Sequence, residues 1–423
     1  MSHDLIIRGG RIVDGTGLPG YLGDIAIRDG RIVEIGRIDG PADRVIDADG
    51  LTVAPGFIDH HTHFDAQILW DPLASSSCWH GVTTVVTGNC SLSLAPCKPK
   101  DRDGVIGSFV RVEAISRPAL EAGLDWEWVS FGDYLNRIGR RLGTNVACLA
   151  GHSAIRQFVM GDDACDRTAR PDEIKRMRQA VREAIDAGAI GLSVNQSRHH
   201  FREDGRPIPS SAAPREEQVE LAAVLGELNA GMIQVNGGSM GVEVDPEENY
   251  RFLRTLAKAS GRPILFNTIS QRWQTPGVWQ QALDLGAECL REGLRIHGTI
   301  STLPSHNQFT LANAQVMFDN MPTWRPLMFA SKEERMAGFR DPARRPKLRY
   351  EALEDPTRYN FHKRWDLVTV KEAKRPENKR WEKQSIAAIA QAQGKHPVDA
   401  FLDLALAEDL ETIFETSTTN GDP

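Results

Sequence analysis

The sequence is poor in cysteine, in long apolar runs and in excess positive charge. Six cysteines occur in 423 residues, and no two of them form a CxxC pair. This is too few for a disulfide framework and indicates a reducing compartment. No apolar run approaches membrane-spanning length, and the first residues lack the basic segment and apolar core of a secretory signal. We therefore expect a cytoplasmic protein that does not bind membranes.

The charge balance and the glycine pattern exclude two further classes of partner. Fifty basic and fifty-seven acidic side chains leave a net charge of −7, so a general electrostatic attraction to nucleic acid is not expected. No GxxxxGK[ST] phosphate loop occurs, and the Gly237-Gly238 pair lacks the strand-to-helix context of a dinucleotide site. With 41% hydrophobic and 25% charged residues, the composition is that of an ordinary globular protein with a large core.

The sequence pattern of the first part of the chain predicts β structure. Short alternating runs between Asp4 and Ala54 are separated by Gly-Gly, Asp-Gly-Thr-Gly and Asp-Gly turns, a pattern typical of antiparallel hairpins. About fifty such residues cannot close a stable core alone. We expect residues 1–55 to form part of a small, incomplete β-sandwich, with strands in the runs 5–7, 11–13, 24–27, 31–35 and 51–53.

From residue 56 onward, apolar strands alternate with helical stretches, which favours an α/β fold with a parallel sheet. The clearest helix is predicted over 171–187, where apolar residues recur at helical spacing up to Gly188. We expect residues 56–423 to form a TIM-like (β/α)8 barrel that lacks its eighth strand and last βα unit, with long insertions near 91–144 and 302–383. The seven candidate strands are 56–59, 83–87, 145–150, 189–194, 232–235, 263–267 and 294–299.

The sharpest chemical signal is an HxH motif at the end of the first candidate strand, in Gly56-Phe-Ile-Asp-His-His-Thr-His63. Residues two apart in a strand face the same side, so His61 and His63 can offer ring nitrogens to one divalent metal. Two barrel-end histidines with ordinary hydrogen bonds are the alternative. We expect a metal half-site here.

The second candidate strand delivers Cys90 to the same end of the sheet, through Thr83-Thr-Val-Val-Thr-Gly-Asn-Cys90. A thiolate is a strong zinc ligand, and its pKa falls beside a cation. A lone buried cysteine is more often an apolar filler. Together with the two histidines, however, Cys90 could complete or bridge a metal site.

These motifs resemble the N-acyl-D-amino-acid deacylase (D-aminoacylase) branch of the amidohydrolase superfamily. The resemblance rests on the HxH strand with its continuation Phe64-Asp65, on His80-Gly-Val-Thr-Thr84 and on Gly88-Asn-Cys90. Later stretches are similar to the same branch, namely 149–156, 188–193 and 209–217. The resemblance implies a metal-dependent barrel that hydrolyses the amide bond of N-acyl-D-amino acids or related N-acyl compounds by metal-activated water.

By this resemblance His61, His63 and Cys90 are metal ligands, and the cofactor is zinc, as one or two divalent ions. Two departures stand out. The family's fifth and sixth strands usually end in histidines, whereas Asn236 and Asn267 are found near these positions, and a neutral amide is a poor zinc ligand. The family's general-base aspartate lies on an eighth strand, which we expect beyond Pro423, so that this chain is expected to be truncated and, as given, inactive.

Softer candidates remain near the third and seventh strands. His152 and Arg156, four residues apart, could bind the substrate's carbonyl and carboxylate, since arginine suits a bidentate contact with a carboxylate. A role in fixing the geometry of the loop is equally open for this pair. His297 and His306 could replace a missing metal ligand, although a structural role is favoured for both.

Two other functions stay open. A cyclic-amide hydrolase of the hydantoinase or dihydroorotase kind shares the HxH strand. It usually needs a carboxylated lysine on the fourth strand, and Gly191-Leu-Ser-Val194 has none. The other is an inactive, metal-deficient barrel that only binds a ligand or partner, which the missing histidines of the fifth and sixth strands favour.

Overall fold

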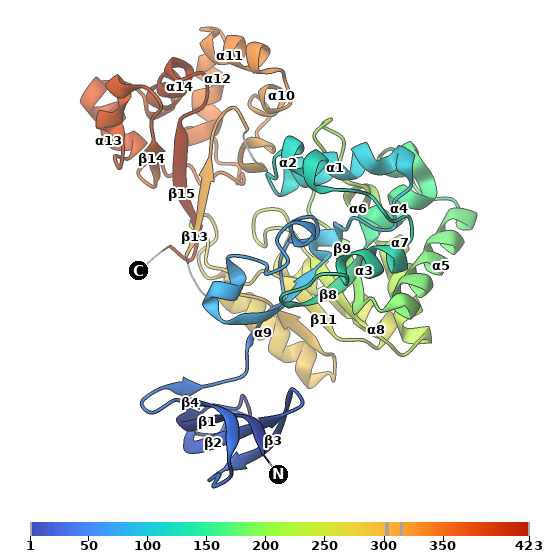
Figure 1. Ribbon diagram of the computed structural model, residues 1–423. Coiled ribbons are helices and arrows are strands. Elements are labelled where there is room, and N and C mark those ends of the chain that lie inside the picture. Colours follow the sequence, from blue (N-terminus) through green and yellow to red (C-terminus); the bar gives the residue numbers. More distant parts are fainter. Residues whose placement is uncertain (1, 301–303, 314–315, 422–423) are drawn as a thin grey trace. The chain divides into compact units, whose positions relative to one another are not determined.

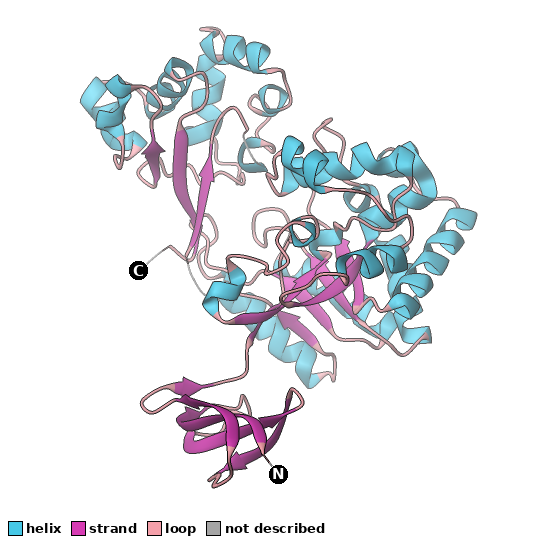
Figure 2. Cartoon of the chain, in the orientation of Figure 1, coloured by secondary structure: helices cyan, strands magenta, loops and turns pink. Residues whose placement is uncertain are grey.

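The computed structural model describes residues 2–300, 304–313 and 316–421. The backbone divides into two compact units, Met1–Asp59 with Ser75–Val85 and His60–Ala74 with Val86–Pro423. The boundary between them falls inside strand β7 (Val82–Thr87). Figures 1 and 2 show a β-rich N-terminal part and a larger part that contains both strands and helices.

The N-terminal unit contains a five-stranded sheet in the order β3-β2-β1-β4, with β5 also paired to β1. β2 pairs antiparallel with both β1 and β3, as the glycine turns predict. β4 and β5, in contrast, pair with β1 in parallel, so the hairpin pattern does not extend to the whole region. The five strands are β1 (His3–Ile12), β2 (Tyr21–Arg28), β3 (Arg31–Gly36), β4 (Ala42–Asp47) and β5 (Thr52–Val53).

The predicted turn at Gly9-Gly10 is wrong. β1 runs straight through both glycines, and its pairing register with β2 shifts between Ile7 and Gly10, as at a β-bulge. Gly9 adopts φ +72°, and its N–H donates to Asp24 Oδ1 at 2.8 Å. Glycine at positive φ is a bulge signal as well as a turn signal, and here the pairing partner decides between them.

The larger sheet has seven strands that follow one another in sequence order from β6 to β12. Each begins and ends within two residues of its predicted position, and neighbouring strands run parallel in the registers from β8 to β12. The expected α/β architecture, with a parallel sheet after a small β-rich part, is confirmed. The strands are β6 (Phe57–Asp59), β7 (Val82–Thr87), β8 (Asn145–Gly151), β9 (Gly191–Asn195), β10 (Met232–Asn236), β11 (Ile264–Asn267) and β12 (Ile296–Gly298).

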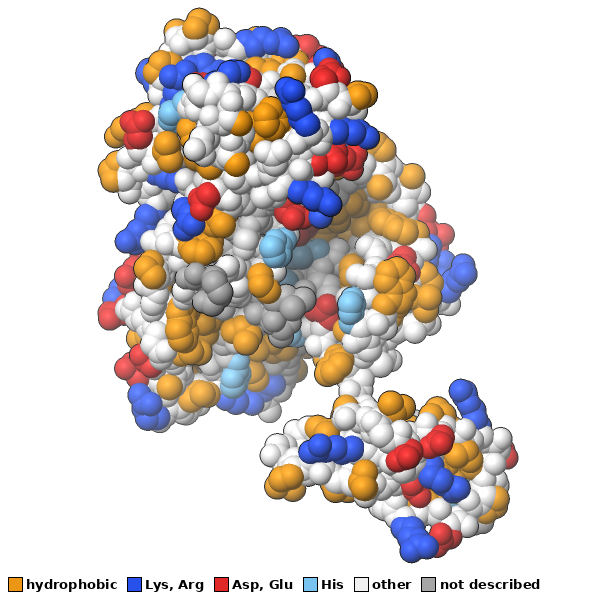
Figure 3. Space-filling model, turned by 90° about the vertical axis from the view of Figure 1, so that its left-hand side faces the viewer, with side chains coloured by type: hydrophobic (Ala, Val, Ile, Leu, Met, Phe, Trp, Pro, Cys, Tyr) orange, Lys and Arg blue, Asp and Glu red, His pale blue; other side chains and the backbone are white. Residues whose placement is uncertain are grey.

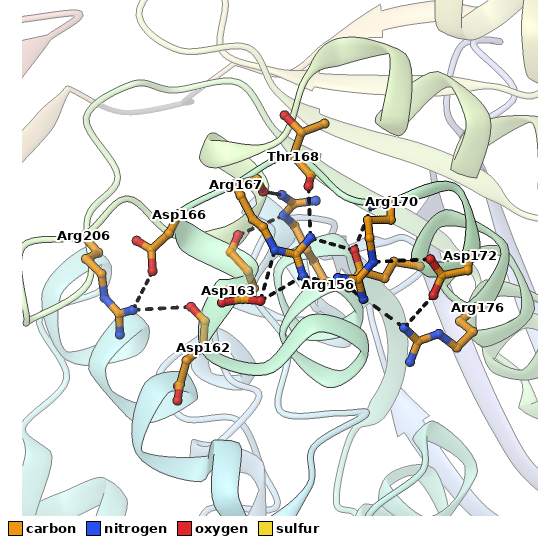
Figure 4. A network of polar contacts seen from close by, with 12 residues as sticks. Arg156, Asp162, Asp163, Asp166, Arg167, Thr168, Arg170, Asp172, Arg176 and Arg206 are labelled. Atoms are coloured by element: carbon orange, nitrogen blue, oxygen red, sulfur yellow. Dashed lines mark hydrogen bonds and ion pairs between the residues drawn. The ribbon is translucent and has the colours of Figure 1, made fainter.

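Helices connect these strands and flank the sheet (Figure 2). Helix α5 (Pro171–Ala187) has the predicted bounds and ends where Gly188 turns to φ 115°. At its start Glu173 accepts from the backbone N–H of Arg170 at 2.8 Å, and arginine–aspartate pairs surround this end (Figure 4). The other long connecting helices are α4 (His152–Met160), α7 (Arg215–Glu227), α8 (Pro246–Ser260) and α9 (Val278–Arg291).

Two further segments build the parts outside this sheet. The excursion after β7 contains α1 (Arg102–Val112), α2 (Arg117–Gly123) and α3 (Phe131–Ile138). Beyond β12 a three-stranded antiparallel sheet has the order β13-β15-β14, formed by β13 (Ser305–Phe309), β14 (Val368–Glu372) and β15 (Ile413–Thr419). Helices α10 (Arg325–Met328), α11 (Lys332–Arg340), α12 (Arg345–Arg349), α13 (Ile386–Gln393) and α14 (Pro397–Ala407) accompany it.

This C-terminal segment has a core of its own, rich in aromatic rings. Phe318 stacks on Trp324 with ring centroids 4.6 Å apart, and Phe401 meets Phe414 at 4.5 Å. The run from Ile386 to Thr419 packs into this core and its sheet. Within the described residues, no helix is long and apolar enough to cross a membrane.

Candidate metal centre

The two histidines of the HxH motif lie on the segment that follows β6. Thr62, between them, anchors this segment to β7: its backbone N–H and its hydroxyl both donate to the carbonyl of Val86, at 3.1 and 2.7 Å. The anchor fixes the segment at the carboxyl end of β7. His61 and His63 then lie with ring centroids 5.3 Å apart and planes at 70°.

Cys90 lies in a tight turn directly after β7. Gly88 begins the turn at φ +79°, and a Cβ there would lie 2.1 Å from the carbonyl oxygen of Leu149, so only glycine fits. Cys90 itself has φ +53°. The side chain of Asn89 donates to the carbonyls of Thr62 and Val86, at 3.1 and 2.9 Å. One asparagine thus ties the cysteine turn to the histidine segment.

The structure brings His61, His63 and Cys90 together, with their ligand atoms all within 4.8 Å of one another. Cys90 Sγ is 3.4 Å from His61 Nε2. Two ligands about 2.0–2.3 Å from a tetrahedrally bound zinc ion are separated by about 3.4–3.6 Å. The arrangement therefore fits a small divalent cation, and ligation by these three residues stays a prediction.

Two carboxyl groups beside the three residues were not singled out from the sequence. Asp65 is 1% exposed, and both of its carboxylate oxygens lack a hydrogen-bond partner among the described residues. Glu113, which follows α1, has Oε1 3.4 Å from His63 Nε2. The signal for Asp65 was its place two residues after His63. Glu113 comes from the excursion after β7, where no periodicity marks it.

Burial governs the acid–base properties of this group. It raises the pKa of Asp65 to about 8, helped by the nearby charge of Glu113, and raises the pKa of Glu113 to about 8. It also raises the pKa of the Cys90 thiol and lowers the pKa of His63 to about 4. Desolvation thus opposes every charged form here, and a divalent cation would reverse that balance for the acids and the thiol. The oxygens of Asp65, which have no hydrogen-bond partner among the described residues, agree with such a cation.

The other side of Cys90 is formed by two neutral amides. The amide oxygen of Gln234, on β10, accepts from the Cys90 backbone N–H at 2.8 Å, and Asn267, at the end of β11, donates to Cys90 Sγ at 3.6 Å. Gln234 also donates to Asn267 Oδ1 at 2.6 Å. The sequence placed Asn236 and Asn267 at these strand ends. Both residues end their strands, but the side chain of Asn236 donates to Asn195 Oδ1 at 2.7 Å, whereas that of Asn267 contacts Cys90.

A cavity of about 320 Å³ adjoins the centre. Asn267 lines it and contacts Cys90, and His200, another lining residue, is near enough to His63 for the two charges to interact. Figure 3 shows histidine side chains in a hollow of the larger part. Arg272 lines the cavity, and its guanidinium has no hydrogen bond or ion pair within the described residues. Burial lowers its pKa, and the charge of Glu243 opposes that shift.

His152 and Arg156 lie elsewhere. Both side chains are fully buried, and neither lines the cavity. Nε2 of His152 and Nη1 of Arg156 contact Glu217 Oε1 at 2.9 and 2.6 Å, and Arg156 also bonds the carbonyl of Ala164 (Figure 4 shows Arg156). In this geometry both side chains hold α4 against α7. Substrate binding by the pair stays a prediction that the cavity does not support.

The remaining candidates lie outside the centre. His297 and His306 are both exposed, and neither belongs to the group of converging ligand atoms. β9, the strand that would carry a carboxylated lysine, instead has Ser193, whose hydroxyl accepts from the backbone N–H of Ser91 at 3.1 Å. A general-base aspartate beyond Pro423 stays a prediction.

Comparison with known proteins places the chain among its relatives. Residues 44–420 match the model of the amidohydrolase family. The chain belongs to this family. A D-aminoacylase of Alcaligenes xylosoxydans xylosoxydans is 38% identical over 192 residues, which cover 45% of this chain and 37% of that protein. An uncharacterized protein of Mycobacterium tuberculosis is 37% identical over 240 residues, 53% of this chain and 38% of the relative.

The solved structures agree with the fold. N-acyl-D-glutamate deacylase from Bordetella bronchiseptica, complexed with zinc and a phosphonate inhibitor, has a TM-score of 0.63 at 22% identity, covering 99% of this chain and 72% of that one. At this identity the likeness shows the amidohydrolase fold and nothing finer. The chain spans less than half the length of the curated relatives that it matches.

Proposed function

We propose that this amidohydrolase is a metal-dependent enzyme that cleaves the amide bond of N-acyl-D-amino acids or related N-acyl compounds. The observation that carries the proposal is the convergence of His61, His63 and Cys90 beside a cavity large enough for a small acylated amino acid. The matched relatives include D-aminoacylase and the N-acyl-D-aspartate and N-acyl-D-glutamate deacylases. Zinc, as one or two ions, is the proposed cofactor, and the six free cysteines favour the cytoplasm.

Each part of the site has a proposed task. When bound by His61, His63 and Cys90, zinc would polarise the scissile carbonyl and activate water. Asn89 and Thr62 hold the ligand segments in place. Arg272, which has no carboxylate partner of its own in the described residues, would bind the carboxylate of the substrate, since a guanidinium matches that group with two parallel hydrogen bonds.

The activity is tested on the longest available gene product, by measuring release of free amino acid from N-acyl-D-amino acids and from their L forms. We expect hydrolysis of the D forms that is lost on chelation and restored by zinc. In the Arg272→Gln variant KM for the carboxylate substrate should rise at least tenfold, with little change for the matching carboxamide. Arg291→Gln, at the exposed end of α9, is the control. Absence of metal-dependent release from every N-acyl compound would overturn the proposal.

A second candidate function is a barrel that binds a ligand without metal chemistry. The observation that favours it is the amide pair of Gln234 and Asn267, which satisfies its own hydrogen bonds at a place where imidazole ligands are usual in the family. Such a protein would hold well under one equivalent of metal. Metal content therefore separates the two candidates before any substrate is known.

A further inference from the structure

We infer that Glu113 supplies a fourth, anionic ligand to the metal centre, from the excursion that follows β7. The inference rests on the proposed metal centre and adds to it a residue outside the strand ends. The resulting set of two imidazoles, one thiolate and one carboxylate suits a zinc-class divalent cation.

The first support is distance. Glu113 Oε1 lies 3.4 Å from His63 Nε2, which matches the separation of Cys90 Sγ from His61 Nε2. Both equal the spacing of about 3.4–3.6 Å expected between ligand atoms of one tetrahedral ion. Among the described residues, the ligand atoms of His61, His63 and Cys90 all lie within 4.8 Å of one another, and Glu113 is not part of this group. Rotation about its side-chain bonds can move the carboxylate inward without moving the backbone.

The second support is the lack of any other partner. Glu113 is 17% exposed, and among the described residues its carboxylate has no ion pair or hydrogen bond apart from the His63 contact. Its neighbour Arg111 is paired with Asp319, and Arg117 is paired with Asp103, Glu121 and Glu203. These two arginines are thus engaged elsewhere, and the carboxylate of Glu113 contacts the ligand cluster through His63.

The third support is charge. The buried carboxyl group of Asp65 and the partly buried carboxyl group of Glu113 lie beside the Cys90 thiol, and no lysine or arginine pairs with either acid in the described part of the chain. Buried acids without a cationic partner are costly. A divalent cation at this point balances a thiolate and one carboxylate. Gln234 and Asn267, on the opposite side of the thiol, carry no charge and cannot do so.

The backbone at the C-terminal end of α1 positions Glu113 beside the metal centre. It caps the C-terminal end of α1, where its N–H bonds the carbonyl of Phe109 at 3.1 Å, and the chain then turns through Ala114 at φ +54°. Phe109 is 1% exposed and fixes the inner face of the helix. The end of α1 is therefore held in place, and the carboxylate comes to the centre from outside the sheet.

The test uses Co²⁺ as a spectroscopic probe, titrated into metal-free protein. For Glu113→Gln we expect at least hundredfold weaker Co²⁺ binding and an altered visible d–d band, while the thiolate-to-cobalt charge-transfer band of Cys90 persists. Glu113→Asp keeps the carboxylate and should recover part of the affinity. Glu121→Gln, on the exposed face of α2, is the matched control and should behave as the unmodified protein. Circular dichroism of the metal-free variants checks that each is folded.

An unchanged d–d band in folded Glu113→Gln, with or without a modest loss of affinity, would overturn the inference, since Glu113 would then only support His63. Cys90→Ser separates this outcome from failure of the centre itself. If Cys90→Ser loses Co²⁺ binding and Glu113→Gln does not, only the fourth ligand is wrong. If neither variant changes Co²⁺ binding, the proposed metal centre is wrong as well.

Discussion

The two sides of Cys90 differ in kind. On one side the segments after β6 and β7 bring imidazole nitrogens and the thiol together, with Cys90 Sγ 3.4 Å from His61 Nε2. On the other side β10 and β11 bring Gln234 and Asn267, which bond to each other at 2.6 Å. One side has the ligand chemistry of a metal centre, and the other is a satisfied pair of neutral amides. From this comparison we expect a zinc ion on the histidine side of the proposed centre and none on the amide side.

The largest effect is expected when the two amides beside Cys90 are replaced by histidines, which removes the difference between its two sides. We expect the double variant Gln234→His and Asn267→His to bind two equivalents of zinc per chain instead of one, because the new nitrogens can share the Cys90 thiolate with a second ion. Elemental analysis after dialysis measures this. Asn236→His is the control and should stay at one equivalent, since Asn236 faces Asn195. A double variant that still holds one equivalent would show that the amide positions do not face a metal site.

A second variant, Glu243→Gln, tests the stability of the cavity wall independently of the metal centre. Burial alone would raise the pKa of Glu243, but hydrogen bonds from His199 and from the backbone N–H of Ser239 lower it from 4.5 to about 2. A depressed folded-state pKa means that the ionised carboxylate stabilises the native state fully above pH 4.5 and loses this effect as the pH falls from 4.5 toward about 2.

We therefore expect Glu243→Gln to lower the free energy of unfolding by about 2 kcal/mol at neutral pH. The difference from the unmodified protein should shrink as the solution is acidified through that range. Urea unfolding at a series of pH values measures it. Glu247→Gln, an exposed change at the start of α8, should show almost no difference at any pH. A deficit for Glu243→Gln that does not vary with pH would contradict the assigned ionisation.

The smallest expected effect is at the amide that contacts the thiol. Asn267→Ala removes the hydrogen bond to Cys90 Sγ, found at 3.6 Å, and should weaken zinc binding by less than tenfold, or about 1 kcal/mol. Calorimetric titration of the metal-free protein measures this change, with Asn236→Ala for comparison. Complete loss of zinc in Asn267→Ala would mean that the amide is itself a ligand, and the two sides of the thiol would then be equivalent.

The fold could be predicted where one local signal decided the structure. Apolar runs between helical stretches located all seven parallel strands, since a buried parallel strand must be apolar on both faces. The helix from Pro171 to Ala187 was predicted for the same reason, from its spacing and the closing Gly188. Gly9-Gly10 was mistaken for a turn because glycine at positive φ occurs both in turns and in β-bulges. Only the pairing of β1 with β2 shows that a bulge is present here.

The site was predictable only as far as neighbouring strands determine it. His61, His63 and Cys90 follow strands that are adjacent in the sheet, and the carboxyl ends of parallel strands meet at one edge. Glu113 and Arg272 lie on connecting segments whose course no periodicity gives. His152 and Arg156 were singled out together from their spacing, but the residue that holds them, Glu217, is more than sixty positions away. A contact over that separation leaves no trace in a single sequence.

The most direct measurement is the metal content of the purified chain, compared with a variant in which His61, His63 and Cys90 are all alanine. After reconstitution with zinc and dialysis, the unmodified chain should retain about one equivalent, and the triple variant well under a tenth of that. A triple variant that holds zinc as firmly as the unmodified chain would contradict the metal centre, and so would an unmodified chain that retains none.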